Sequence, residues 1–278
     1  MKSRQRQHGL TLMETTVVIT AVALLAVFAL PAIRGLFNSL ESRGSTKAMI
    51  NATLSSARAM ALKNQKYTGI RFQQDLAGHQ YMIFIINDEE IPNGTQGNLG
   101  CRAIEGIEPL KLPDSIGVMD LITVGRTQSG PGHINVKEKD ITKSGSDTHI
   151  DNEIDDPNEL RDTTTFAILF SPSGKLVIHS LWVLNRDGYR SHHLDESFDS
   201  IFNKFDKVQE WKALFYQDDY FGSATTDLGL GPELSRRFFV IYDKNIFKQI
   251  DVDERWSEYL KDLPHIHLNP YTGTMINK

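Results

Sequence analysis

Hydrophobic residues are concentrated in one long run near the start of the chain. The 24 residues from Leu10 to Ile33 carry a single charge, Glu14, and would form roughly 36 Å of helix, enough to cross a bilayer. Three basic residues and no acidic residue precede the run, at Lys2, Arg4 and Arg6. Because positive charge stays on the cytoplasmic side, the pattern predicts one membrane span with residues 1–9 in the cytoplasm and the remaining chain outside it.

The helical pattern continues past the apolar run. Ile50, Leu54, Ala57 and Ala61 follow each other at spacings of 4, 3 and 4, which places them on one face of a helix. We therefore expect one long N-terminal helix over residues 10–64, with 10–33 in the membrane and the second half packed on a soluble domain. Pro31 would bend this helix.

From Tyr67 onward the pattern changes to the alternation of apolar and polar residues that is typical of strands. Strands are expected at 67–72, 80–86, 116–124, 165–170, 176–184, 237–242, 265–268 and 275–276, with turns at 75–78, 172–174 and 270–273. The expected fold class is α+β: the long N-terminal helix packed on an antiparallel, β-rich globular domain over residues 65–278.

Two stretches interrupt the strand pattern of this domain. Residues 195–217 carry large apolar residues at helical spacing, so we expect a helical insert whose apolar face packs on the sheet or docks another protein. Asp251 and Glu254 could cap a short helix that runs to Leu260. Residues 142–162 form an acidic insert.

Glu14 needs a cationic partner if it enters a membrane. A carboxylate well inside a membrane helix costs roughly 2.5–3.5 kcal/mol on insertion scales, and such residues are usually paired. A simple signal anchor would leave Glu14 reaching back to the interface. A secretory signal peptide is the other alternative, but its apolar region is normally shorter and ends at a cleavage site.

The stretch from Gly9 to Glu14 resembles the N-terminus of the type IV prepilin and pseudopilin family. By this resemblance residues 1–9 are a basic leader, Gly9 is the residue before the cut, and Leu10 is the new, N-methylated terminus. Glu14 matches the fifth mature residue, and Pro31 matches a helix-bending proline. In that family the partner of the glutamate is thought to be the free terminal amine, which cleavage by the prepilin peptidase exposes.

Two further segments are similar to the GspH/FimT subgroup of this family. They are residues 57–65 and the turn from Phe170 to Gly174. The resemblance implies a structural minor pseudopilin of a type II secretion system, not an enzyme. It would cross the inner membrane once, with its C-terminal domain in the periplasm, and residues 10–33 would form the filament core after assembly. Its partners would be other pseudopilins or pilins and the inner-membrane assembly platform. The alternatives are a FimT-like minor pilin of a type IV pilus that takes up DNA, and a membrane-tethered periplasmic enzyme or binding domain.

Composition narrows these alternatives. The chain of 278 residues has a formal charge of −5, which becomes −8 when the three basic residues of the leader are removed. A net acidic chain disfavours nucleic acid as a partner, because such binding requires neutralisation of phosphates. Cys101 is the single cysteine, so no internal disulfide can form, and a buried thiol is the favoured interpretation over a bond between chains.

The sequence nominates no catalytic residue, metal site or cofactor. The acidic insert could supply oxygen ligands to calcium, but its spacing fits no known calcium loop and favours a solvated segment. His265 and His267 would share one face of a strand, and His192 and His193 are adjacent, yet neither pair has the further ligands that zinc needs. Seven acidic residues define the insert: Asp147, Asp151, Glu153, Asp155, Asp156, Glu159 and Asp162.

Overall fold

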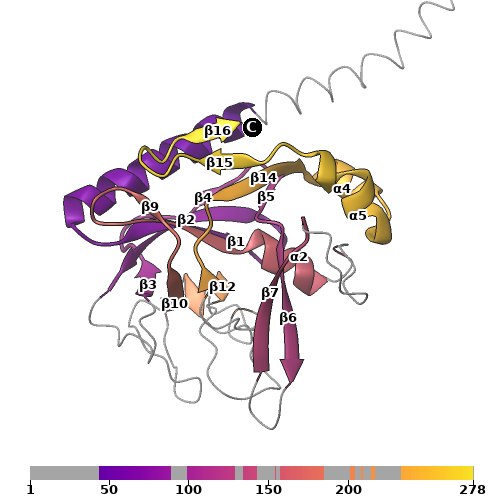
Figure 1. The fold of residues 1–278 in the computed structure, drawn as a ribbon, viewed down its shortest axis with the longest axis horizontal. Coiled ribbons are helices and arrows are strands. Elements are labelled where there is room, and N and C mark those ends of the chain that lie inside the picture. The colour runs from indigo at the N-terminus through magenta and orange to yellow at the C-terminus, as the bar shows by residue number, and fades with distance from the viewer. Residues whose placement is uncertain are drawn as a thin grey trace, which may run out of the picture. The chain divides into compact units, whose positions relative to one another are not determined.

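The computed structural model describes residues 44–88, 99–128, 134–142, 154, 157–184, 201–203, 208, 214–216 and 233–277. Residues 45–278 form one compact unit. Its described elements are one helix over residues 44–64, two larger sheets, two strand pairs and several short helices (Figure 1).

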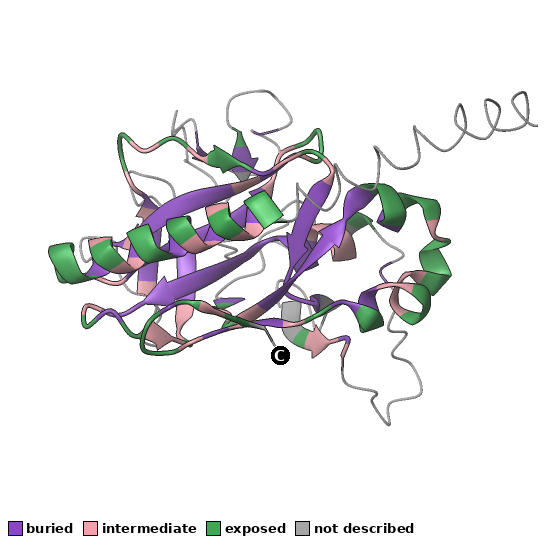
Figure 2. Ribbon diagram, turned by 90° about the horizontal axis from the view of Figure 1, so that it is seen from above, coloured by how far each residue is buried: buried purple, intermediate pink, exposed green. Residues whose placement is uncertain are grey.

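The helix over residues 44–64 packs with one face on both larger sheets. Ile50, Leu54, Ala57 and Ala61 have no exposed surface, whereas Ser55 and Ser56, on another side of the helix, are exposed (Figure 2). This confirms the apolar stripe that the spacing predicts.

The main sheet has eight strands. β1 (Thr68–Gln74) lies at its centre between β2 (Gln80–Asn87) and β8 (Phe166–Phe170), and both pairings are antiparallel. The full order is β13 (Glu233–Leu234), β10 (Ser180–Leu184), β3 (Leu99–Ala103), β2, β1, β8 and β9 (Leu176–Val177), with β4 (Leu110–Lys111) also paired to β2. β10 and β3 run parallel, so the sheet is mixed.

The order of the strands shows that this sheet curls. Only Ile178 and His179 separate β9 from β10, although β9 lies at one end of the sheet and β10 next to the other end. Three residue steps span at most about 11 Å, so the two ends must approach each other. Ser235 joins them: its Oγ donates to the Val177 carbonyl at 2.7 Å and accepts from the His179 N–H at 2.9 Å. The sheet is therefore a half-barrel.

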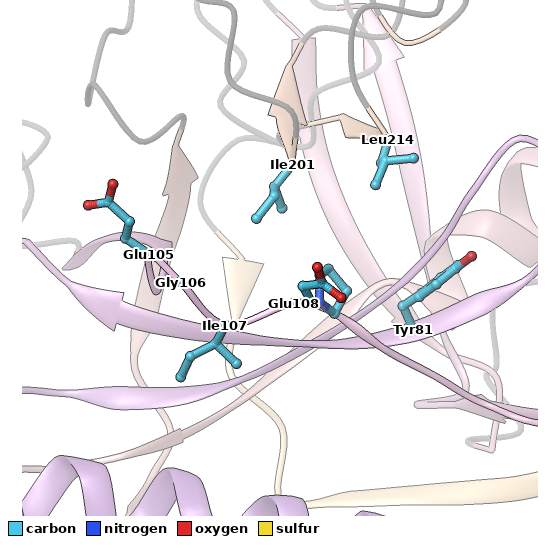
Figure 3. Close-up of a pocket in the computed structure, with 8 residues that line it drawn as sticks. Tyr81, Glu105, Gly106, Ile107, Glu108, Ile201 and Leu214 are labelled. Carbon is cyan, nitrogen blue, oxygen red and sulfur yellow. The ribbon is translucent and has the colours of Figure 1, made fainter.

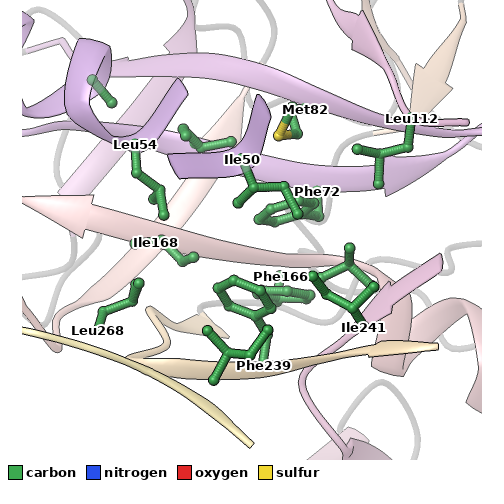
Figure 4. Close-up of a cluster of buried hydrophobic side chains, with 14 of the residues drawn as sticks. Ile50, Leu54, Phe72, Met82, Leu112, Phe166, Ile168, Phe239, Ile241 and Leu268 are labelled. Carbon is green, nitrogen blue, oxygen red and sulfur yellow. The ribbon is translucent and has the colours of Figure 1, made fainter. Parts of the chain in front are cut away.

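The second sheet has four strands, and it packs against the same apolar face of the helix as the main sheet does. Its order is β16 (Met275–Asn277), β15 (Ile266–Leu268), β14 (Phe238–Asp243) and β5 (Ile116–Met119), and every pairing is antiparallel. The helix and the two sheets share one core, which includes Phe72, Phe166, Phe239 and Leu268 (Figure 4). The rings of Phe72 and Phe166 stack at 4.8 Å.

The opposite faces of the two sheets are covered by other elements. On the main sheet, Ile201, Phe202 and Phe215 pack over residues of β2, β3, β8 and β10. On the second sheet, residues from β5 and β14 pack against Phe247 and Leu260 of the short helices. These covering helices are α4 (Lys244–Gln249), η1 (Val252–Glu254), α5 (Arg255–Glu258) and η2 (Leu260–Asp262).

Three more elements complete the described chain. β6 (Ile122–Gln128) and β7 (Ile134–Asp140) form a separate antiparallel hairpin. β11 (Phe202–Asn203) and β12 (Phe215–Tyr216) form a short parallel pair. The helix α2 (Pro157–Thr164) precedes β8.

The predicted fold class is wrong. The described helix covers residues 44–64 rather than a long N-terminal span, and the main sheet is a mixed half-barrel rather than an antiparallel domain. Within the part of the chain that the structure describes, no helix is both long and apolar enough to cross a membrane. The apolar run at 10–33 lies outside the described residues.

Two expected single strands are broken by tertiary contacts. The stretch 116–124 divides into β5 and β6 at Asp120 and Leu121, where Leu121 has a positive φ of 59°. The stretch 176–184 divides into β9 and β10, as described above. Apolar residues lie on both sides of each break, so the hydrophobic pattern did not reveal them.

The expected helical insert at 195–217 is only partly confirmed by the described residues, since Val208 is helical but two short segments are strands. Phe202 lies in β11 and Phe215 in β12, which are strands rather than parts of one helix. Their side chains are nonetheless fully buried against the main sheet, as expected for the apolar face. The short helix expected after Asp251 is present as η1, α5 and η2, although Asp251 makes no side-chain cap.

The other expected strands and turns are confirmed. The hairpin at 67–72 and 80–86 is β1 and β2, and 165–170, 237–242, 265–268 and 275–276 correspond to β8, β14, β15 and β16. Gly174 ends the turn at 172–174 with a positive φ of 72°, a conformation that glycine adopts without strain.

Candidate functional site

The residues predicted to take part in leader processing and assembly all precede residue 44. Gly9, Leu10, Glu14 and Pro31 lie outside the described residues, so their roles stay predictions. Within the compact unit, the sequence nominated no catalytic group.

A polar cluster surrounds the turn between β1 and β2. The Asp75 carboxylate accepts hydrogen bonds from the Ala77 and His79 N–H groups, each at 2.9 Å, and lies 3.0 Å from His79 Nδ1. Tyr81 donates to the other oxygen of Asp75 at 3.4 Å. Burial and the nearby charge of Asp75 raise the pKa of Tyr81. These contacts stabilise a tight turn. They are sufficient to explain why an aspartate stands at position 75, so they give no evidence of a chemical role for its carboxylate.

Lys244 connects this turn to α4. Its Nζ donates to the Gly78 carbonyl at 2.8 Å, and the residue is only 7% exposed. Burial, together with the charge of Lys248, lowers the pKa of Lys244 to about 8. A lysine with a lowered pKa can act as a base or nucleophile, but this ammonium is turned toward a backbone carbonyl. Its geometry fits an anchoring role.

Two buried ion pairs lie inside the unit. Arg71 of β1, with no exposed surface, donates to Glu233 of β13 at 2.8 Å and to Gln73 at 3.1 Å. In the second pair, Arg236 donates to Asp120 at 2.7 Å.

Arg236 also joins Asp120 to the β6–β7 hairpin. Its two terminal nitrogens donate to the Glu138 carboxylate of β7 at 3.0 and 2.8 Å. Burial raises the pKa of Asp120 to about 7, while Arg236 and the Ile122 N–H favour its charged form. The network connects the start of β14 to the β6–β7 hairpin. Its role is therefore to stabilise the fold, not to bind a substrate.

The candidate metal ligands of the sequence do not form a metal site in the described residues. His265 and His267 lie with ring centroids 6.4 Å apart, and each ring is 5.7 Å from that of Phe238. No group of three or more histidine, cysteine, aspartate or glutamate side chains suited to a metal ion occurs in the described part of the chain. His192, His193 and most of the acidic insert are outside it.

Cys101 is a buried thiol, as the sequence analysis favoured. It lies in β3 with no exposed surface, and burial raises its pKa to about 12. A thiol that stays protonated and enclosed neither binds metal nor pairs with another chain.

A surface pocket of about 630 Å³ lies beside the main sheet. Its described lining comprises Tyr81 of β2, residues 105–109 between β3 and β4, and Ile201 and Leu214 next to β11 and β12 (Figure 3). This pocket could not be predicted from the sequence, because its walls come from three stretches that are far apart in the chain. The one local signal was a short Glu-Gly-Ile-Glu-Pro turn at 105–109.

Comparison with known proteins adds no family or fold neighbour. No family model matches the chain, and neither the curated proteins nor the solved structures contain a significant match.

Proposed function

We propose that this chain is a minor pseudopilin that enters the pseudopilus of a type II secretion system. The observation that carries the proposal is the order of residues at the N-terminus. Gly9 stands at the end of a basic leader, Leu10 follows it, and Glu14 is the one charge in the apolar run.

The physical argument concerns the carboxylate of Glu14. Its insertion into an apolar environment is costly without a cation, and cleavage after Gly9 creates a cation at the new terminus, four residues away. The terminal amine of the same or a neighbouring subunit would pair with Glu14 and set the register of the helical bundle. Because close packing replaces lipid contacts, assembly needs no further ligand.

The division of the chain supports this function. Residues 45–278 form a compact unit with its own buried cores, as the proposal requires of a domain that folds without residues 10–33. In the proposal this stretch lies in the inner membrane until the assembly platform extracts it. The compact unit then faces the periplasm and supplies contacts to neighbouring subunits.

The N-terminus of the protein provides the first test. The full chain is produced in a host with a prepilin peptidase and a type II secretion system, and the mass of its N-terminal peptide is measured. We expect a chain that begins with methylated Leu10. An intact leader in the working protein would contradict the proposal.

Substitution of the carboxylate provides the second test. We expect Glu14→Gln to be cleaved normally but to enter purified pseudopili at least about tenfold less than wild type, which corresponds to roughly 1.4 kcal/mol of lost pairing. Glu41→Gln is the matched control, since it removes the same charge outside the apolar run. Equal incorporation of the two variants would refute the role of Glu14.

A further inference from the structure

The pocket beside the main sheet combines apolar walls with an acidic rim. Tyr81, Ile107, Pro109, Ile201 and Leu214 contribute aromatic and aliphatic surface. The Tyr81 ring is held by an edge-on contact with Phe215, at 5.2 Å between centroids. The volume of about 630 Å³ lies within the range of about 300–1,000 Å³ that ligand sites occupy.

Two carboxylates on this rim have no cation beside them in the described part of the chain. Glu105 and Glu108 are both exposed, and neither makes a side-chain hydrogen bond or ion pair to another described residue. The basic residues closest to them in sequence are already paired, Arg102 with Asp88 and Lys111 with Asp114. Among the described residues, the charge of these two carboxylates is therefore not neutralised.

The exposure of Leu214 shows that the pocket is open at the surface. Leu214 is 53% exposed although the next residue, Phe215, is fully buried. A large apolar side chain at the mouth of an acidic pocket gains from a partner that covers it, because burial of apolar area is favourable. An extended polypeptide can cover this leucine while one of its side chains enters the pocket.

We propose that the pocket binds an extended peptide segment of a partner protein in which lysine or arginine stands beside an apolar residue. The aliphatic stem of the basic side chain lies on Tyr81 and Ile201, and its charged end meets Glu105 or Glu108. The neighbouring apolar side chain of the peptide covers Leu214. Charge complementarity selects a basic segment over an acidic or neutral one.

A fluorescence-anisotropy titration tests this assignment with the purified full chain. The probe is a labelled hexapeptide of alternating lysine and leucine, and the comparison peptide carries glutamine in place of lysine. We expect the lysine peptide to bind more tightly, and its affinity to fall as salt is added. Equal binding of the two peptides, or no binding of the lysine peptide, overturns the proposal.

Matched double variants identify the site. Glu105→Gln with Glu108→Gln should weaken the lysine peptide by about fivefold, the effect of removing two exposed charge contacts. Glu254→Gln with Glu258→Gln makes the same change in net charge at two exposed positions that do not line the pocket, and should leave the affinity unchanged. Equal effects of the two double variants overturn the proposal.

Two further measurements test the apolar wall and the class of ligand. Leu214→Ser should weaken the lysine peptide by about threefold, as expected for loss of part of one apolar contact. Free spermidine should compete poorly, since it has no apolar side chain for Leu214. Spermidine binding as tight as that of the peptide would overturn the assignment to a polypeptide. Because these measurements need no filament, they are independent of the proposed assembly function.

Discussion

The buried ion pair between Arg71 and Glu233 allows a quantitative test of the half-barrel. Arg71 lies on the central strand β1 and Glu233 on the edge strand β13, 162 positions apart in sequence. The two side chains are 0% and 7% exposed, and their N–O distance is 2.8 Å. Their contact exists only if the main sheet curls as described, so its energy reports on the curvature of the sheet.

The expected magnitudes follow from the burial of both groups. Removing one partner of a buried ion pair costs about 3–5 kcal/mol, because the other charge remains in an apolar setting. Arg71→Met and Glu233→Leu should therefore each lower the free energy of unfolding by about that amount. The double variant should cost only about 1–3 kcal/mol, mainly because Gln73 loses the hydrogen bond that Arg71 donates.

Urea unfolding at pH 7 measures these differences in a double-mutant cycle. Trp182 of β10 is 7% exposed, so its fluorescence should report the loss of the sheet. Arg237→Met is the control, since Arg237 is exposed and its replacement should change stability by no more than about 0.5 kcal/mol. If Arg71→Met is as stable as the control, or if the single variants add without coupling, the described pair is wrong.

The remaining predictions concern three single positions. Gly69→Ala should destabilise the unit by about 1–3 kcal/mol or more in urea unfolding, because the added Cβ would lie 2.1 Å from the Ile168 carbonyl oxygen across β1 and β8; wild-type stability would contradict this packing. Cys101 should resist a thiol-labelling reagent in the folded protein and react after denaturation, since burial raises its pKa to about 12; fast labelling of the native state would show that it is accessible. Lys244 should make the unit more stable as pH rises from about 8 toward 10.5, because its lowered pKa means that the folded state binds fewer protons than the unfolded state in this window. Lys244→Met should reduce this rise, and an identical pH profile for variant and wild type would refute the shift.

The fold of the compact unit and the proposed function depend on different residues of the chain. Assembly as proposed depends on residues that precede the compact unit, whereas the pocket, the ion pairs and the three clusters belong to the unit itself. Mutations in Arg71 or Gly69 should therefore act through stability, and mutations in Glu14 through assembly. This separation allows each proposal to fail without the other.

Local patterns in the sequence were sufficient for several elements. The spacing of Ile50, Leu54, Ala57 and Ala61 identified the buried face of the helix, because a helix repeats every 3.6 residues whatever it packs on. Alternation identified β1, β2 and β8, and the turn before Gly174 required no distant partner. The proposed leader and the roles of Gly9, Leu10 and Glu14 rest on the sequence alone and stay predictions.

Only the tertiary structure decided how those elements combine. The sequence predicted only that Arg71 lies in a strand, and it is the curled sheet that buries this residue beside Glu233. The parallel pairing of β3 with β10 and the pocket around Tyr81 likewise join segments far apart in the chain. The physical reason is that periodicity reports which face of a strand is apolar, whereas strand order, sheet curvature and the burial of the second face depend on long-range packing.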